Sequence, residues 1–143
     1  MQVRKASKKD TKPILELLVQ LRPGPSNKYQ YNYFVKIIQK YLADKDKQIL
    51  VAVAGLKIVG LASLVFLPRL NQKLELWIPE LVVDSKYRKK GVGKSLIKSC
   101  MDAAKKKRCF RIRLESGNKR RGSHAFYRKI GFEQYALSFQ KLA

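Results

Sequence analysis

The stretch VVDSKYRKKGVGKS, residues 82–95, decides the fold of this chain. An apolar strand end leads into a basic loop with two glycines, and the loop leads into a long amphipathic helix. Backbone N–H groups at a helix N-terminus point outward and carry the positive end of the helix dipole, so they bind phosphate groups. Gly91 and Gly93 let the main chain approach an anion without an intervening Cβ. The stretch therefore predicts a strand–loop–helix unit that holds a phosphate.

Two familiar phosphate-binding motifs do not fit this spacing. A P-loop needs a glycine separated by four residues from Gly-Lys-Ser, and that position holds Arg88. A dinucleotide-binding motif needs a third glycine at the position of Leu96. The glycine loop therefore belongs to another kind of phosphate site.

The rest of the chain predicts one α/β domain, residues 1–143, with a mixed sheet. Apolar alternation and turn residues predict strands over 3–5, 48–54, 57–66, 74–83, 110–114 and 132–141. A first helix is expected after Asp10 or Thr11, with Pro13 in its first turn. Three more helices are expected over 31–43, 91–107 and 123–129, and a breaker cluster over 22–27 predicts a loop.

Two segments needed a choice between interpretations. Residues 49–67 are long and apolar enough to span a bilayer, but Lys57 lies near their centre and Gly55 marks a turn, which favours a hairpin of two buried strands. Pro79 interrupts the strand predicted over 74–83, and a proline inside a strand indicates a bulge or a splayed edge.

The composition is strongly basic, with 32 Lys+Arg against 10 Asp+Glu and a formal net charge of +22. Such a charge attracts polyanions, which include nucleic acids, anionic membranes and phosphorylated small molecules. Cys100 and Cys109 lack metal-ligand spacing, and one histidine, His124, cannot complete a zinc site, so we expect no metal. Reduced thiols and the absence of a signal-peptide pattern predict a cytoplasmic protein.

Two motifs resemble the GNAT superfamily of N-acetyltransferases. The pattern Arg88-x-x-Gly91-x-Gly93 after a valine-rich strand is similar to the acetyl-CoA pyrophosphate loop of that family. The stretch from Leu114 to Phe132 is similar to a second block found in its small-molecule amine acetyltransferases. The resemblance covers about residues 74–134. It implies a mostly antiparallel sheet that splays between the fourth and fifth strands and is flanked by helices.

The resemblance also implies an acetyl-CoA site with acetyl-CoA as co-substrate. Backbone groups of the strand before the loop would bind the pantetheine arm, and the loop itself would bind the pyrophosphate. The residues implied are Leu81, Val82, Val83, Arg88, Lys89, Lys90, Gly91, Val92, Gly93, Lys94 and Ser95. Arg120 and Ser123 occupy positions where the family usually has Asn and Ala, and we expect them to contact the same ligand.

Two residues receive catalytic roles from the resemblance. Glu80 occupies the position of a carboxylate that takes a proton from the amine, and the other interpretation is a strand carboxylate that is exposed or paired with a lysine. Tyr127 matches a tyrosine that gives a proton to the departing thiolate, and the other interpretation is a core aromatic beside Phe126. We expect His124 to be a structural hydrogen-bonding residue.

The predicted partners are acetyl-CoA and an amine acceptor, either a small molecule or a protein, and the chain is compatible with a homodimer. The resemblance places substrate-facing segments at 21–33 and 135–139, where Tyr29, Tyr31 and Tyr33 either line a pocket or pack. The alternative hypothesis is a basic nucleic-acid-binding protein on the same scaffold, with phosphate contacts from 105–108 and from 120–121.

Overall fold

The computed structural model covers residues 1–143 and describes all but residues 23, 25 and 26 and the side chains of residues 28 and 29. The chain divides into two compact units, Met1–Arg113 and Leu114–Ala143. This division describes contacts and does not test whether the chain folds as one domain, so the single-domain expectation stays a prediction. Of the predicted breaker loop, Arg22, Gly24 and Asn27 lie outside helices and strands, and the rest falls outside the described residues.

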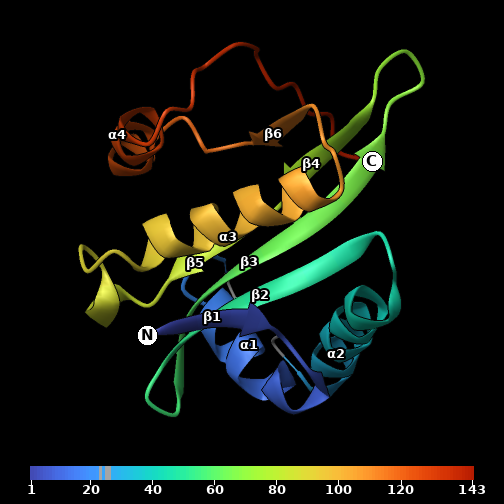
Figure 1. Cartoon of the computed structure of the whole chain (residues 1–143). Coiled ribbons are helices and arrows are strands. Elements are labelled where there is room, and N and C mark those ends of the chain that lie inside the picture. Colours follow the sequence, from blue (N-terminus) through green and yellow to red (C-terminus); the bar gives the residue numbers. More distant parts are fainter. Residues whose placement is uncertain (23, 25–26) are drawn as a thin grey trace. The chain divides into compact units, whose positions relative to one another are not determined.

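Six strands form one sheet within the described part of the chain (Figure 1). They are β1 (Gln2–Lys5), β2 (Lys47–Ala54), β3 (Lys57–Pro68), β4 (Leu74–Ile78), β5 (Leu81–Val83) and β6 (Arg111–Leu114). The order is β1-β2-β3-β4-β6, and β5 pairs with β3 alone. The pairs of β1 with β2, β2 with β3, and β3 with β4 and β5 are all antiparallel.

The hairpin interpretation of the long apolar segment is confirmed. Ala54 pairs with Lys57, so Gly55 and Leu56 form the turn, and Gly55 adopts the positive φ of 61° that glycine tolerates. The central residues of both strands are buried because helices pack on both faces of each strand. Among the described residues, no helix is long and apolar enough to cross a membrane.

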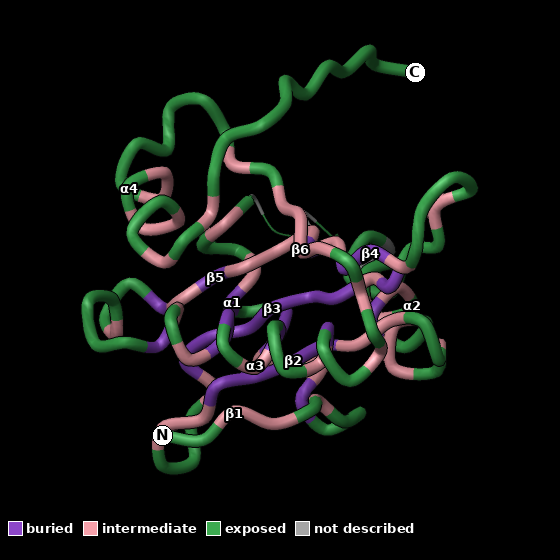
Figure 2. The backbone as a smooth tube through the Cα atoms, turned by 45° about the horizontal axis from the view of Figure 1, so that its top comes forward, coloured by how far each residue is buried: buried purple, intermediate pink, exposed green. Residues whose placement is uncertain are grey.

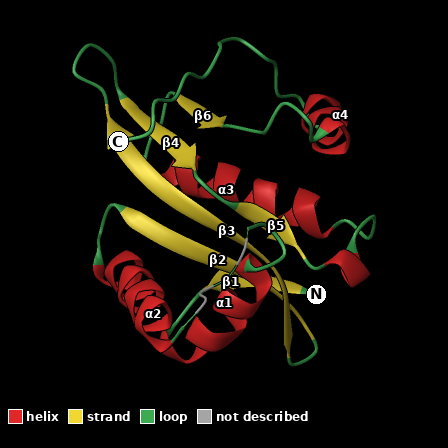
Figure 3. Cartoon of the chain, turned by 180° about the vertical axis from the view of Figure 1, so that it is seen from behind, coloured by secondary structure: helices red, strands yellow, loops and turns green. Residues whose placement is uncertain are grey.

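Helices cover the two faces of the sheet in the first unit. The register pairs Val51 with Leu61, and both belong to the core cluster that packs under α1 (Thr11–Leu18) and α2 (Lys28–Ala43). On the other face lies α3 (Val92–Lys106), as Figures 1 and 3 show. A Cβ at Gly60 would meet Val92 at 2.9 Å, so this glycine lets the start of α3 approach the sheet closely.

Burial follows the predicted helix faces (Figure 2). The residues of α3 that the sequence placed on its apolar face are buried: Val92, Leu96, Cys100 and Ala104. Those predicted to face away are exposed: Lys94, Lys98, Asp102 and Lys105. Burial raises the pKa of Cys100 to about 12, so this thiol stays protonated and serves the core.

The side chains of Asp10 and Asn27 accept backbone hydrogen bonds near the starts of α1 and α2. The Asp10 carboxylate accepts a hydrogen bond from Ser7 N at 2.8 Å and pairs with Arg4 at 2.8 Å, rather than capping α1 through its own side chain. The hydrogen bond from Arg4 and the bond from Ser7 N outweigh burial and lower the pKa of Asp10 to about 2. Asn27 caps α2 by accepting from Gln30 N at 2.9 Å, so this helix begins three residues earlier than predicted, at Lys28.

The side chain of Glu75 on β4 is fully buried among arginines. Its carboxylate lies 2.6 Å from Arg111 Nε, 2.9 Å from Arg113 Nε and 3.2 Å from Arg69 Nη1. Burial by itself would raise the pKa of Glu75, but the hydrogen bonds from Arg111 and Arg113 outweigh it and hold the pKa below its ordinary value. Glu75 therefore stays ionised and ties β4 to β6.

The second unit contains α4 (Arg121–Lys129) and an irregular C-terminal segment. The strand predicted over 132–141 is wrong: these residues belong to no strand, and residues 133–143 are all exposed (Figure 2). Alternating apolar residues stabilise a strand only where a neighbouring strand supplies backbone partners. No described residue pairs with this segment in a ladder, so its pattern alone does not make it a strand.

Candidate active site

The interruption predicted at Pro79 is a bulge in the edge of the sheet. Val65 of β3 pairs with Trp77, whereas Ala62 pairs with Leu81. Two residues of β3 therefore lie opposite three residues, 78–80, on the other side. Ser63 N donates to Glu80 O at 3.0 Å and keeps the backbone attached on the β3 side. Before the bulge β4 has β6 as its neighbour, whereas after the bulge β5 pairs with β3 and not with β6. The chain that ends at Val83 therefore parts from β6, as the predicted splay requires.

Ser63 fixes the position of Glu80. The backbone N–H of Glu80 donates to Ser63 Oγ at 2.9 Å, and the same hydroxyl donates to Glu80 Oε2. The other carboxylate oxygen, Oε1, has no hydrogen-bond partner among the described residues. Glu80 is partly exposed, and within the described residues its carboxylate bonds Ser63 rather than a lysine.

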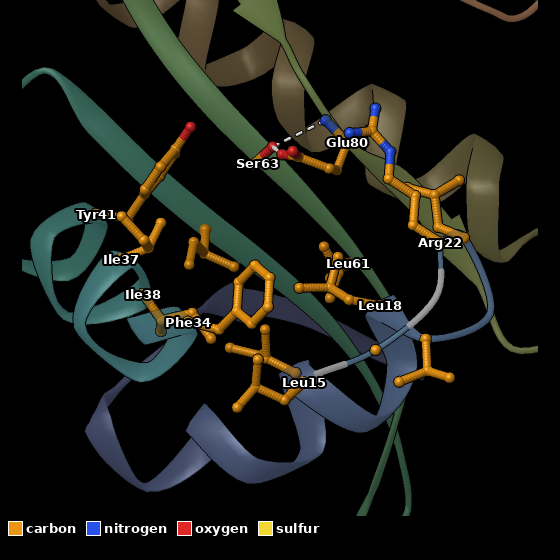
Figure 4. A pocket seen from close by; sticks show the side chains of 15 residues that line it. Leu15, Leu18, Arg22, Phe34, Ile37, Ile38, Tyr41, Leu61, Ser63 and Glu80 are labelled. Atoms are coloured by element: carbon orange, nitrogen blue, oxygen red, sulfur yellow. Dashed lines mark hydrogen bonds between the residues drawn. The ribbon is translucent and has the colours of Figure 1, made fainter. Parts of the chain in front are cut away.

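Glu80 lies at one end of an apolar pocket of about 360 Å³ (Figure 4). The wall consists mainly of aliphatic and aromatic side chains from α1, the turn after it, α2, β2 and β3. Its apolar members are Ile14, Leu15, Leu18, Val19, Leu21, Phe34, Ile37, Ile38, Ile49 and Leu61. Glu80 is the one carboxylate in the described lining, so a cationic or hydrogen-bonding group entering the pocket is directed to it.

Part of the segment predicted to face the substrate lines the pocket. Leu21, Arg22 and Gly24 line it. Tyr31 and Tyr33 do not line it and are exposed on α2, and the side chain of Tyr29 falls outside the described part.

Tyr41 on α2 is a site residue that the sequence pattern did not single out. It lines the pocket, and burial together with the charge of Glu80 raises the pKa of its phenol. A raised pKa keeps Tyr41 protonated at neutral pH, so the hydroxyl can donate a hydrogen bond. Tyr41 lies within the apolar stripe of α2, so the sequence pattern predicts a packing residue. The feature that marks it as a site residue is the nearby charge of Glu80, which the sequence does not show.

Local hydrogen bonds shape the turn from β5 into α3. Asp84 accepts from Lys86 N at 3.0 Å through its side chain and from Tyr87 N at 2.8 Å through its carbonyl, which forms the short 3-10 helix η2 (Ser85–Tyr87). The bond from Lys86 N and the charge of Lys57, 3.3 Å away, lower the pKa of Asp84. Asp84 therefore stays ionised and holds the base of the turn.

The tip of the turn carries two residues in the left-handed backbone region. Lys89 has a φ of 60° and Gly91 a φ of 83°. Gly91 is the N-cap of α3, and no side chain of the described residues caps the helix. Ser95 N donates to Gly91 O at 3.0 Å, so the first intrahelical bond begins there, and the preceding amides of Val92, Gly93 and Lys94 point out of the helix.

This turn fits a diphosphate. Uncapped amides at the start of a helix bind anions, and the exposed Lys89 and Lys90 add positive charge beside them. Val92 contributes only its backbone because its side chain is buried. Arg88 Nε lies 3.4 Å from Val83 O, so this side chain folds back along β5.

The remaining predicted site residues belong to the second unit. His124 Nε2 lies 2.8 Å from Gly117 O, which agrees with a structural role. Tyr127 packs edge-on against Phe126 and Phe132, with ring centroids 5.3 and 5.7 Å apart. Burial raises the pKa of Tyr127, against an opposing effect of Arg120. Ser123 is half-buried on α4, and Arg120 N donates to Gly117 O at 2.9 Å.

The fold and the site define a class of protein: a mixed α/β sheet, flanked by helices, with a glycine-bearing helix start that no side chain of the described residues caps, and a pocket whose described lining holds one carboxylate. Residues 11–132 match the acetyltransferase (GNAT) family, and the chain belongs to that family. Among the described residues, no group of three or more His, Cys, Asp or Glu side chains is placed to hold a metal ion.

Curated relatives agree with this family. The chain is 36% identical over 81 residues to glucosamine 6-phosphate N-acetyltransferase of Trypanosoma brucei brucei, covering 55% of this chain and 53% of the relative. It is 28% identical over 105 residues to human N-acetyltransferase 8, covering 72% of this chain and 46% of the relative. The chain thus spans about half the length of the curated relatives it matches.

Solved structures share the fold over the whole chain. A transcriptional regulator from Bacillus halodurans C-125 superposes with a TM-score of 0.92 at 23% identity, covering 99% of both chains. A putative acetyltransferase from Agrobacterium tumefaciens superposes with a TM-score of 0.87 at 25% identity, covering 100% of both. An aminoglycoside 6'-N-acetyltransferase from Acinetobacter haemolyticus gives 0.81 at 21% identity, covering 100% of this chain and 99% of that one.

Proposed function

We propose that this chain transfers the acetyl group of acetyl-CoA to a primary amine. The observation that carries the proposal is the position of Glu80. Its carboxylate is fixed by Ser63 at the polar end of the pocket, and β5 alone separates it along the chain from the phosphate-binding turn. A proton acceptor, an acceptor pocket and an anion site therefore occur in one unit.

Glu80 acts as the general base. A primary amine is largely an ammonium at neutral pH, and an ammonium has no lone pair with which to attack. Glu80 Oε1 has no hydrogen bond to the described residues and faces the pocket lining, so it can accept the proton directly or through one water. Ser63 holds the other oxygen and the backbone, and so orients the base.

The acetyl-CoA site is assigned to the residues around the turn. The amides of Val92, Gly93 and Lys94 would bind the pyrophosphate, with Arg88, Lys89, Lys90 and the Ser95 side chain around them. The backbone of β5, Leu81–Val83, would bind the pantetheine arm, and Arg120 and Ser123 of the second unit would add contacts. When bound, acetyl-CoA supplies a thioester carbonyl carbon that is open to attack by an amine.

Tyr127 acts as the general acid. In the transfer Glu80 takes one proton from the ammonium and passes it to solvent, and the C–N bond forms as the C–S bond breaks. The Tyr127 hydroxyl protonates the departing sulfur, and the second proton from the nitrogen restores that hydroxyl through water. Because burial raises the pKa of Tyr127, the phenol keeps its proton throughout the neutral range and is available as a donor.

The decisive experiment combines calorimetry with thiol release. We expect acetyl-CoA to bind and to release thiol in the presence of a primary amine, and acetylpantetheine, which lacks the phosphates, to bind at least tenfold more weakly. Equal affinities would remove the turn from the proposal. Salt-sensitive retention of RNA without thiol release from any amine would instead support the nucleic-acid-binding alternative.

A further inference from the structure

The candidate pocket has a polar end and an apolar end. Figure 4 shows the Tyr41 hydroxyl, Ser63, Glu80 and the Arg22 guanidinium at one end, while Leu15 and Phe34 lie toward the other. Phe34 keeps 38% of its surface exposed, so the apolar wall is open to an entering molecule. A ligand that fills the pocket therefore has one polar head, placed at Glu80, and an apolar body.

Few polar groups in the lining are available to such a ligand. The Ser63 hydroxyl is used on both sides, because it accepts from Glu80 N and donates to Glu80 Oε2. Within the described residues, the groups at this end without a hydrogen bond are Glu80 Oε1, the Tyr41 hydroxyl and the exposed Arg22 guanidinium. Glu80 and Tyr41 suit a single amine nitrogen, and the charge of Arg22 repels a second cation.

The rest of the lining opposes polar acceptors. A hydroxyl placed among Ile14, Leu18 and Ile37 would lose its hydrogen bonds to water and gain none, and one such loss typically lowers affinity about tenfold. A second ammonium in the same place would be opposed more strongly, because an unpaired buried charge costs more than a neutral polar group. Arg22, the one cation in the described lining, is exposed.

The size of the pocket limits the acceptor further. Its volume of about 360 Å³ is near the lower end of the range of roughly 300–1,000 Å³ found for small-molecule sites. A short chain or one ring fills such a space.

We propose that the acceptor is a small primary amine with one positive charge and an uncharged apolar body, such as an alkylamine or an arylalkylamine. This inference rests on the proposed acetyl transfer and names the substrate class of the same site. It separates this chain from its relative named for glucosamine 6-phosphate, whose substrate carries hydroxyls and a phosphate.

A homologous series of amines tests the apolar wall. Thiol release is measured with propylamine, butylamine and pentylamine at fixed acetyl-CoA. Each added methylene that leaves water for the pocket should raise kcat/KM roughly fourfold until the pocket is full. A flat series would overturn the inference, because it would show that the body of the acceptor does not contact the apolar wall.

Amines that differ only at the end away from the reacting nitrogen test whether the apolar wall rejects polar groups. Pentylamine, 5-aminopentanol and cadaverine share a five-carbon chain and differ at the far carbon, which carries a hydrogen, a hydroxyl or an amino group. We expect kcat/KM to fall at least tenfold from pentylamine to aminopentanol and further to cadaverine. Higher kcat/KM with cadaverine, glucosamine or glucosamine 6-phosphate than with pentylamine contradicts the proposal.

Two variants on α2 test whether the pocket wall determines which amine is preferred. Phe34→Ala enlarges the apolar end and should shift the best substrate toward amines longer than pentylamine, with at least a fivefold loss for butylamine. Tyr31→Ala is the matched control, because Tyr31 is on the same helix, is equally exposed at 38%, and does not line the pocket. An equal effect of both variants would remove the pocket from acceptor selection.

The outcomes for the acceptor class and for the reaction are distinguishable. If no amine of any class releases thiol while acetyl-CoA binds, the proposed acetyl transfer fails. If polar amines are acetylated and apolar amines are not, the reaction stands and the apolar acceptor class is wrong. Binding of pentylamine, followed by NMR with desulfo-CoA present, gives a readout that does not depend on turnover.

Discussion

Three hydrogen bonds join Ser63 of β3 to Glu80 at the bulge between β4 and β5, and two of them use the Ser63 hydroxyl. The Ser63 hydroxyl accepts the backbone N–H of Glu80 at 2.9 Å and donates to its carboxylate, so one residue satisfies the backbone at an irregular strand position and orients a side chain there. A bulge exposes a backbone N–H that regular pairing would occupy. The interruption at Pro79 and the placement of the candidate base are thus one structural feature.

Glu80→Gln should lower kcat/KM about 100-fold at neutral pH, because an amide cannot accept the amine proton. The loss should shrink as pH rises toward the pKa of the acceptor, where free amine becomes abundant. Thiol-release rates from pH 6 to 10 measure this. Glu16→Gln, on the exposed face of α1, is the control and should behave like the parent protein. Unchanged activity of Glu80→Gln at every pH would exclude Glu80 from the mechanism.

Ser63→Ala should lower kcat about tenfold with little change in KM for acetyl-CoA, because Glu80 loses the group that orients it. Ser63→Thr keeps a hydroxyl on a strand that tolerates β-branched residues and should restore most of kcat. If the threonine variant is as impaired as the alanine variant, Ser63 contributes packing and does not position Glu80.

Gly91→Ala should weaken acetyl-CoA binding about tenfold or more, because the φ of 83° is strained for an L-residue and the turn must rearrange. Gly55→Ala is a close control: its φ is 61°, and a Cβ at either glycine meets nothing within 4 Å. Each change should cost about 1 kcal/mol of stability. Calorimetry should therefore detect weaker binding only for Gly91→Ala, and equal affinities would contradict a phosphate role for this turn.

Tyr127→Phe should slow transfer about 10- to 100-fold while the Kd for CoA changes less than threefold. A raised pKa means that the phenol is protonated below that pKa and loses its proton as pH rises through it, above its ordinary value near 10. The parent protein should therefore lose kcat only at strongly alkaline pH, and Tyr127→Phe should lack this limb. A large loss of CoA affinity would instead make Tyr127 a packing residue.

Glu75→Gln should destabilise the fold by roughly 3–5 kcal/mol, because it leaves the Arg111 and Arg113 guanidinium groups without their buried counter-charge. The folded-state pKa of Glu75 lies below its unfolded value, so this contribution is present above about pH 4 and is lost as pH falls through the folded pKa. Urea unfolding at pH 7 and pH 3 measures both effects. A similar difference between parent and variant at the two pH values would show that the charge of Glu75 is not responsible.

The sequence by itself determined the elements whose signals are local. The apolar repeat of α3, the turn at Gly55 and the break at Pro79 depend on residues within a few positions of each other, and all three are present in the structure. The glycine-bearing turn before α3 is equally local. Helix periodicity, strand alternation and the φ preference of glycine act over one or two turns of chain, which is why the printed sequence shows them.

Only the tertiary structure decided the features that depend on residues far apart in the chain. In the sequence Glu75 has the pattern of an ordinary strand carboxylate, and only the fold pairs it with Arg111 and Arg113. Tyr41 has the pattern of an apolar-face residue, and only the fold places the charge of Glu80 near it. The alternating pattern over 132–141 joins no strand ladder of the described residues and forms no strand. Backbone pairing, burial and charge each require a neighbour in space, and a linear pattern does not specify that neighbour.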